Sequence, residues 1–136
     1  DERLVVSSGM WHRSDGVKAM NSLFDSGVIP DGVVALNDML ASGVMHAIQM
    51  HDYRIPEDIS VIGFDNSDDS QYLSPALTSI DPGLEAVARL SVKVLKERID
   101  GREPNGEHPG RKVFRKASSS LVMRQSTKLP QESLVV

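Results

Sequence analysis

Two hydrophobic patterns alternate along the first eighty residues. Short, β-branched apolar runs occur at residues 4–6, 31–36 and 59–64, and such runs bounded by turn residues are typical of buried strands. Between them, residues 14–27 and 38–52 carry apolar side chains at the three- and four-residue spacing of a helix with one buried face. The succession of strands and helices predicts an α/β fold with a parallel sheet and right-handed crossovers.

The strand at residues 59–64 is apolar at almost every position, which is typical of a strand covered on both sides. We therefore expect a three-layer arrangement, a parallel sheet with helices on both faces. Residues 77–80 are expected to form a fourth strand or an exit from this unit. Asn37 or Asp38 can cap the helix that follows the strand at residues 31–36.

A longer helix is expected in the second half of the chain. Asp81 can cap it, Pro82 can open it, and its apolar stripe continues to about Asp100. The remaining expectations are a Gly- and Pro-containing loop at residues 101–110, short strands around Val113 and at residues 121–123, and a loose tail at residues 129–136.

The composition limits the class of protein. Apolar residues make up 40% of the 136 residues and charged residues 25%, and no apolar run approaches the roughly 18 residues of a membrane helix. We expect no membrane association. Because the chain has no cysteine, it has no disulfide, thiolate zinc site or thiol nucleophile, and with no secretory signal visible we expect a cytoplasmic location.

Charge and motifs exclude several activities. The net charge of −4 is unlike that of a domain that binds DNA phosphates by itself, which normally has an excess of Lys and Arg. The four histidines lack the spacing of metal ligands, so we expect no metal. No phosphate-binding loop, nucleophile motif or cofactor motif is present, so we expect neither a cofactor nor an enzyme.

Polar side chains follow two of the predicted strands. Asn37 comes after the strand at residues 31–36, and Asp65 directly follows Phe64. In parallel α/β sheets ligands bind beyond the carboxyl ends of the strands, so this pair predicts a site for hydroxyls or ring nitrogens, with Trp11 as a stacking surface. The alternative is structural, with Asn37 a helix cap, Asp65 a turn residue and Trp11 a packing anchor.

Most of the chain resembles the effector-binding domain of LacI/GalR family transcription regulators. The resemblance is carried by P-D-x-V-x-x-x-N-D-x-x-A-x-G, which contains Asn37, by I-P-E-D-I-S-V-I-G-F-D, which ends at Asp65, and by L-T-S-I and L-V-x-R-x-S-T. It implies a periplasmic-binding-protein-like fold of two α/β lobes with a ligand in the cleft. It also implies a small polar effector, a sugar or a nucleobase-like molecule, bound by Trp11, Asn37 and Asp65.

The same resemblance implies a domain plan and partners. Residues 1–80 would be the C-terminal lobe, residues 81–117 a segment of the N-terminal lobe, residues 118–128 the return strand and residues 129–136 the tail. The helix at residues 83–100 would then pack elsewhere or against a neighbouring chain. Operator DNA would be bound only by a separate N-terminal helix-turn-helix domain.

Family members commonly form homodimers, and the resemblance places this contact on the helix after Asn37 and on the loop that follows Asp65. The positions expected there are Leu40, Val44, Met45, Tyr72 and Leu73, although the same helix face can equally be core. A second function stays open at this stage, an extracytoplasmic solute-binding protein of a sugar transport system, because it shares the fold.

Overall fold

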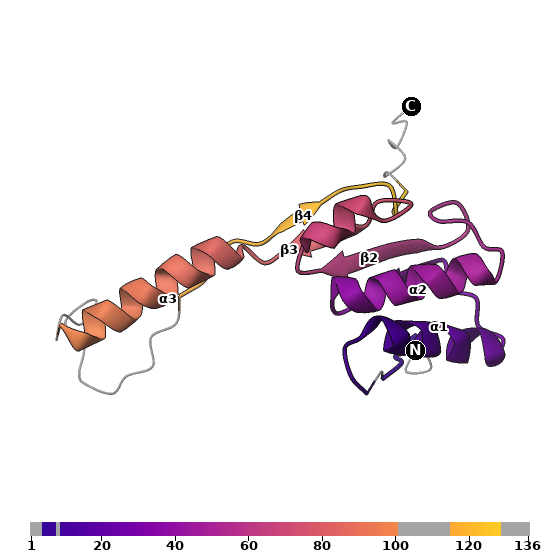
Figure 1. Ribbon diagram of the computed structural model, residues 1–136, viewed down its shortest axis with the longest axis horizontal. Helices are drawn as coiled ribbons and strands as arrows, with labels where there is room; N and C mark the ends of the chain where they lie inside the picture. Colours follow the sequence, from indigo (N-terminus) through magenta and orange to yellow (C-terminus); the bar gives the residue numbers. More distant parts are fainter. Residues whose placement is uncertain (1–3, 8, 101–114, 129–136) are drawn as a thin grey trace, which may run out of the picture. The chain divides into compact units, whose positions relative to one another are not determined.

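The computed structural model describes residues 4–7, 9–100 and 115–128. Helices and strands alternate through the first part of the chain, and a long helix follows (Figure 1). The elements in chain order are α1 (Arg13–Asp25), β1 (Gly32–Val34), α2 (Asp38–Met50), β2 (Ser60–Phe64), the 3₁₀-helix η2 (Asp68–Tyr72), β3 (Thr78–Asp81), α3 (Leu84–Ile99) and β4 (Ser120–Val122).

The strands form one sheet in the order β1-β2-β3-β4. β1 runs parallel to β2, with Val34 opposite Ile62, and β2 runs parallel to β3, with Phe64 opposite Ile80. A parallel pair requires a crossover between its strands, and α2 supplies the one between β1 and β2. The predicted parallel α/β fold is confirmed.

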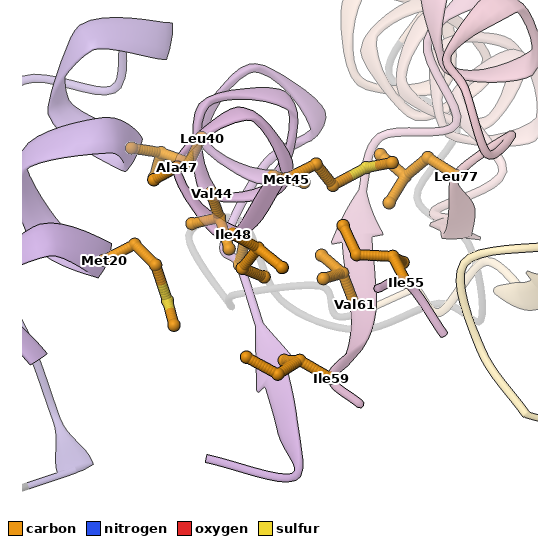
Figure 2. Packing of buried hydrophobic residues seen from close by; sticks show 12 residues of the cluster. Met20, Leu40, Val44, Met45, Ala47, Ile48, Ile55, Ile59, Val61 and Leu77 are labelled. Atoms are coloured by element: carbon orange, nitrogen blue, oxygen red, sulfur yellow. The ribbon is translucent and has the colours of Figure 1, made fainter. Parts of the chain in front are cut away.

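The core lies between the sheet and the two helices α1 and α2. Met20 of α1, Ile48 of α2 and Val61 of β2 are each 1% exposed or less, and Figure 2 shows α2 between α1 and β2. Burying a side chain of this size contributes about 1.5–3 kcal/mol. The apolar stripe of α2 is thus what joins α1 to the sheet.

Two glycines allow α1 and α2 to approach closely. A Cβ atom on Gly16 would overlap the carbonyl oxygen of Leu40, and a Cβ on Gly43 would overlap the carbonyl oxygen of Arg13. Both clashes involve backbone atoms of the other helix or its start, which cannot move aside as a flexible side chain can. Gly16 and Gly43 therefore set the distance between the helices.

The two faces of the sheet differ in how far their side chains are exposed to solvent. Ala35, just after β1, belongs to the core, whereas Val34 is 70% exposed and Leu36 is 68% exposed. Because α1 and α2 both contribute to the core on the side of Ala35, they cover the same face. Among the described residues, the expected second layer of helices is not seen on the opposite face.

Residues 4–6 are not a strand, and that prediction was wrong. Leu4 and Val5 are 55% and 81% exposed, and these residues have no strand pairing. A cavity of about 370 Å³ lies between this segment and β1, since both line it. A β-branched run is extended in a sheet only when a neighbouring backbone satisfies its N–H and C=O groups, and none lies beside residues 4–6.

The described residues divide into two compact units, with breaks after Ile80 and after Ser120. The second unit contains α3, which has no buried residue. Its first turn differs from the prediction: Gly83, with φ +70°, is the N-cap, and Asp81 accepts a hydrogen bond from the Gly83 N–H at 2.7 Å instead of capping the helix. The left-handed backbone at this position favours glycine.

The strand predicted at residues 121–123 is observed as β4, one residue earlier. The predicted loop at residues 101–110, the strand around Val113 and the tail at residues 129–136 lie outside the described residues. Among the helices of the described ranges, none combines the length and apolar character needed to cross a membrane.

Candidate functional site

Asn37 and Asp65 lie at the same end of two neighbouring parallel strands. The register pairs Val34, the last residue of β1, with Ile62 of β2, and Asn37 and Asp65 follow the carboxyl ends of these two strands. The polar side chains that follow β1 and β2 thus leave the sheet at one edge. This edge is where α/β proteins of parallel topology bind their ligands.

Asn37 is the N-cap of α2. Its side-chain oxygen accepts a hydrogen bond from the Leu40 N–H at 2.7 Å, and its amide nitrogen donates to the carbonyl oxygen of Trp11 at 3.2 Å. The capping role considered from the sequence is therefore present. A carboxamide has two N–H donors and two acceptor sites, so one of each remains for a ligand.

Trp11 lies in the segment before α1 and is 59% exposed. The hydrogen bond from Asn37 to its carbonyl oxygen fixes its backbone next to the start of α2. Because the indole is not packed in the core, it is available as a flat apolar surface. The packing-anchor alternative does not describe this side chain.

Asp65 has an unusual backbone. Its φ is +104°, and the next residue, Asn66, has φ +50°, so two non-glycine residues in succession have a backbone in the region of positive φ. The Asp65 N–H still donates to the carbonyl oxygen of Ile80 at 3.0 Å. The strand pairing thus ends at Asp65, and the chain turns sharply there.

The electrostatic surroundings of Asp65 favour its neutral form. Partial burial raises the pKa of the Asp65 carboxyl above its ordinary value, and the negative charge of Asp38 raises it further. Among the described residues this is the carboxyl whose pKa is raised. A carboxyl with a raised pKa keeps its proton to a higher pH than a free carboxyl does, and only in the protonated form can it donate a hydrogen bond as well as accept one.

Asp38 is a buried carboxylate beneath this turn, only 4% exposed. It accepts hydrogen bonds from the Ser67 N–H at 2.7 Å, from the Ser67 hydroxyl at 2.9 Å and from the Ser79 hydroxyl at 2.6 Å. A buried charge is tolerated when hydrogen bonds satisfy it, and Asp38 has three. Sequence reasoning considered Asp38 only as a helix cap.

Arg124 reaches the same turn from the segment after β4. Its guanidinium donates to the side-chain oxygen of Asn66 at 2.7 Å and to the carbonyl oxygen of Leu77 at 2.7 Å. Its backbone N–H donates to the Thr78 hydroxyl at 2.9 Å. The sequence offered one signal for this residue, the Arg of L-V-x-R-x-S-T, but no indication of its partner.

The cavity of about 370 Å³ is distinct from this polar edge. Trp11 lines it together with apolar residues of α1 and β1, but neither Asn37 nor Asp65 does. The described residues therefore bring Trp11 next to Asn37 through the hydrogen bond to the Trp11 carbonyl oxygen, and the cavity is lined by Trp11 without Asn37 or Asp65. They also contain no group of three His, Asp or Glu side chains that could hold a metal ion.

The residues expected at a dimer contact divide into two groups. Leu40, Val44 and Met45 are buried in the core of this chain, at 7%, 5% and 3% exposed. In contrast, Tyr72 is 76% exposed and Leu73 is half-buried. The three α2 side chains face α1 and the sheet, so the core alternative describes them.

Comparison with known proteins gives consistent matches. Residues 1–127 match the family described as periplasmic binding protein-like domain. The HTH-type transcriptional repressor PurR of Pasteurella multocida (strain Pm70) is 33% identical over 123 residues, which is 90% of this chain and 35% of that protein. The chain thus spans about a third of the length of the curated relatives it matches.

Solved structures of regulators share the fold. A LacI-type transcription regulator from Bifidobacterium animalis subsp. lactis is 40% identical with a TM-score of 0.81, covering 91% of this chain and 42% of that one. The lac repressor dimer bound to operator and the anti-inducer ONPF is 29% identical with a TM-score of 0.78, covering 88% and 39%. The CelR–cellobiose complex is 31% identical with a TM-score of 0.78, covering 93% and 36%.

Proposed function

This chain belongs to the periplasmic binding protein-like domains of the LacI/GalR family of transcription regulators, and from this premise we propose that it senses a small polar effector for a bacterial regulator. The effector is a sugar or a nucleobase-like molecule. Trp11 stacks against it, and Asn37 and Asp65 bind its hydroxyls or ring nitrogens. The relatives named above are regulators, so neither transport nor an enzymatic activity is proposed.

One observation carries this proposal. The parallel pairing of β1 and β2 supports it, because Asn37 and Asp65 both follow the carboxyl ends of these two neighbouring strands. An amide and a carboxyl at one edge of a sheet present donors and acceptors together, which suits neighbouring hydroxyls or the edge of a base. The exposed Trp11, whose carbonyl is bonded to Asn37, adds an apolar face beside them.

Effector binding would act through a change in conformational equilibrium. A ligand shifts a protein between two states only as far as its affinities for the two states differ. In the whole regulator, an effector held by Asp65 and Asn37 would favour one arrangement of the lobes. The coupling free energy would then alter the affinity for operator DNA, which a separate N-terminal domain binds.

The whole protein is proposed to be a cytoplasmic homodimer. Tyr72, 76% exposed on η2, and Met39, 39% exposed in the first turn of α2, support a dimer contact formed by these two elements. We propose Tyr72 and Met39 for this contact in place of Leu40, Val44 and Met45, because the last three side chains are already buried within the chain.

Isothermal calorimetry on the full-length protein that carries this chain tests the proposal. The panel comprises cellobiose, D-galactose, D-ribose, adenine and hypoxanthine. For the best ligand, Asp65→Ala is expected to lower affinity by about tenfold or more, because a hydrogen bond to a charged group contributes about 1.5–3 kcal/mol.

The matched control is Asp68→Ala, which removes an exposed carboxylate from η2, three residues after Asp65. Its affinity is expected to equal that of the wild-type protein. Equal affinities for wild type and Asp65→Ala would remove Asp65 from the site and overturn the proposed chemistry.

A further inference from the structure

We propose that Asp38 is a positioning residue, which holds the turn at Asp65 and Asn66 in the conformation that presents Asp65 to the effector. This inference deepens the proposed function and rests on it, because the role of Asp65 as an effector ligand is itself part of that proposal. Asp38 faces the interior and is 4% exposed, so it acts through other groups of the turn and not by touching the effector.

The turn needs such support because its backbone is unfavourable. Asp65 and Asn66 both have positive φ, at +104° and +50°, a region that residues other than glycine adopt uncommonly even though Asp and Asn enter it more often than most. Such conformations persist only where surrounding structure imposes them, and they gather at ligand sites. Two in succession, at the end of a strand that carries a proposed ligand, call for a specific restraint.

The Asp38 carboxylate supplies this restraint through hydrogen bonds to two serines. Its carboxylate accepts bonds from both the N–H and the hydroxyl of Ser67, at 2.7 and 2.9 Å. It also accepts the Ser79 hydroxyl at 2.6 Å, and the oxygen of that hydroxyl accepts the Asn66 N–H at 3.0 Å. The N–H groups of Asn66 and Ser67 are therefore both anchored, directly or through one hydroxyl, to one carboxylate.

Gly63 makes this arrangement possible. A Cβ atom on Gly63 would overlap the Asp38 carboxylate oxygen and would lie 2.9 Å from a methyl carbon of Leu77. The missing side chain leaves the space in which the Asp38 carboxylate lies beside β2. The glycine of the I-G-F-D segment thus accounts for how a carboxylate from α2 reaches under the turn.

Arg124 holds the same turn from another side. Its guanidinium bonds to the Asn66 side chain at 2.7 Å, so Asn66 is restrained through its backbone by Ser79 and through its side chain by Arg124. Asp65 itself receives no such bond to its carboxyl among the hydrogen bonds of the described residues. Its neighbours are fixed while its own side chain stays available.

The position of Asp38 has an electrostatic consequence that a purely mechanical support would not have. Asp38 is the charged group whose field acts on Asp65, and together with burial it raises the pKa of the Asp65 carboxyl. Arg124, the nearby cation, is engaged with Asn66 and Leu77. Removing the charge of Asp38 should therefore lower the pKa of Asp65 as well as loosen the turn.

The test compares Asp38→Asn with wild type in the full-length protein that carries this chain. Asparagine keeps the shape of the side chain but replaces one acceptor oxygen with a donor, so it cannot accept all three bonds. Amide hydrogen exchange at Asn66 and Ser67 is expected to accelerate by about tenfold or more, with exchange at Val61 in β2 unchanged. The control is Asp69→Asn, a nearby exposed carboxylate, which should change neither.

A second readout is the pH dependence of affinity for the best ligand of the calorimetric panel, measured from pH 4 to pH 8. In Asp38→Asn, the midpoint of the pH dependence that reflects titration of Asp65 is expected to move to lower pH. The affinity for the ligand at pH 7 is expected to fall by about tenfold. A residue that merely stabilises the fold would accelerate exchange at Val61 as much as at Asn66 and would leave the midpoint in place.

The outcomes separate this inference from the proposed function. If Asp38→Asn accelerates exchange only at the turn but Asp65→Ala leaves affinity unchanged, Asp38 restrains the turn and Asp65 is not a ligand, which overturns the positioning role. If Asp65→Ala abolishes binding while Asp38→Asn alters neither exchange nor affinity, the proposed function stands and the positioning role fails. If none of the probes binds, faster amide hydrogen exchange at Asn66 and Ser67 in Asp38→Asn supports the restraint by Asp38, and unchanged exchange at both residues overturns it.

Discussion

The guanidinium of Arg124 and the side-chain oxygen of Asn66 are joined by a 2.7 Å hydrogen bond across 58 residues of sequence. This bond connects the segment after β4 to the turn at the end of β2, and the same guanidinium also holds the Leu77 carbonyl oxygen. The last described part of the chain thus contributes directly to the proposed effector edge.

Arg124→Met should destabilise the chain by about 2–3 kcal/mol, because it leaves the Leu77 carbonyl and the Asn66 side chain without a charged donor in a half-buried region. Urea unfolding monitored by circular dichroism measures this loss. Arg13→Met is the matched control, since the Arg13–Asp69 pair is exposed and is expected to contribute less than about 1 kcal/mol. Equal losses in the two variants would contradict the role given to Arg124.

Gly43→Ala should destabilise the protein by about 1–3 kcal/mol or more, because the added methyl group overlaps the Arg13 carbonyl and forces α1 and α2 apart. Gly32→Ala is the control, since its Cβ would lie 3.6 Å from the nearest atom, the Ser60 carbonyl oxygen, at ordinary contact distance. Thermal unfolding compares the two. A Gly43→Ala variant as stable as Gly32→Ala would show that the helices are not in close contact.

Asn37 has a capping role and a proposed binding role, and two substitutions separate them. Asn37→Ala loses the bond to the Leu40 N–H and should cost about 0.5–2 kcal/mol of stability. Asn37→Asp keeps this acceptor but loses the donor to the Trp11 carbonyl, so its stability should stay within about 0.5 kcal/mol. Effector affinity measured by calorimetry should fall in both variants, and an unchanged affinity in Asn37→Asp would leave Asn37 with the cap alone.

Asp65→Asn should stabilise the fold at neutral pH while weakening effector binding. Because the folded-state pKa of Asp65 is raised, its contribution to stability is full below the unfolded-state value of about 3.9 and is lost as pH rises through the folded-state value. Asparagine removes this penalty and accepts left-handed backbone well. The gain at pH 7 is expected to be below about 1 kcal/mol, because the side chain is exposed and screened by solvent.

Urea unfolding at pH 7 and pH 3 checks the sign of this effect. The advantage of Asp65→Asn over wild type should be present at pH 7 and should shrink at pH 3, where wild-type Asp65 is protonated. An advantage that is larger at pH 3 would contradict the direction of the pKa shift.

The Arg54–Asp58 pair predicts the opposite dependence. Hydrogen bonds from the Arg54 side chain and backbone lower the pKa of Asp58 to about 2. Its stabilising effect is therefore full above about pH 4 and disappears as pH falls towards 2. Asp58→Asn should be less stable than wild type at pH 7, and this difference should shrink as pH falls through about 2, whereas the control Glu57→Gln should show little difference at either pH.

The parts of the fold that depend on local pattern could be predicted from the sequence. The alternation of β-branched runs with helical spacing leads to parallel strands, and parallel strands bring the residues after Leu36 and Phe64 to one edge. That was sufficient to expect Asn37 and Asp65 at one edge of the sheet. The parallel pairing of the two strands is confirmed, whereas a shared site of Asn37 and Asp65 and its binding of an effector stay predictions.

The parts that depend on distant partners could not be predicted. Residues 4–6 have strand propensity but no adjacent strand to pair with among the described residues, so a prediction from propensity alone gave a strand that is not formed. Asp38 receives its bonds from Ser67 and Ser79, which are 29 and 41 residues away. Sequence spacing carries no information about such contacts, because they are set by how the sheet and α2 pack.

Trp11 is the single tryptophan of these 136 residues, it is more than half exposed, and its backbone is tied to Asn37. An indole in water emits at long wavelength, and a molecule that settles against its face would shift or quench this emission. The chain therefore carries an intrinsic optical reporter at the edge where its effector is proposed to bind, and a titration needs no attached dye.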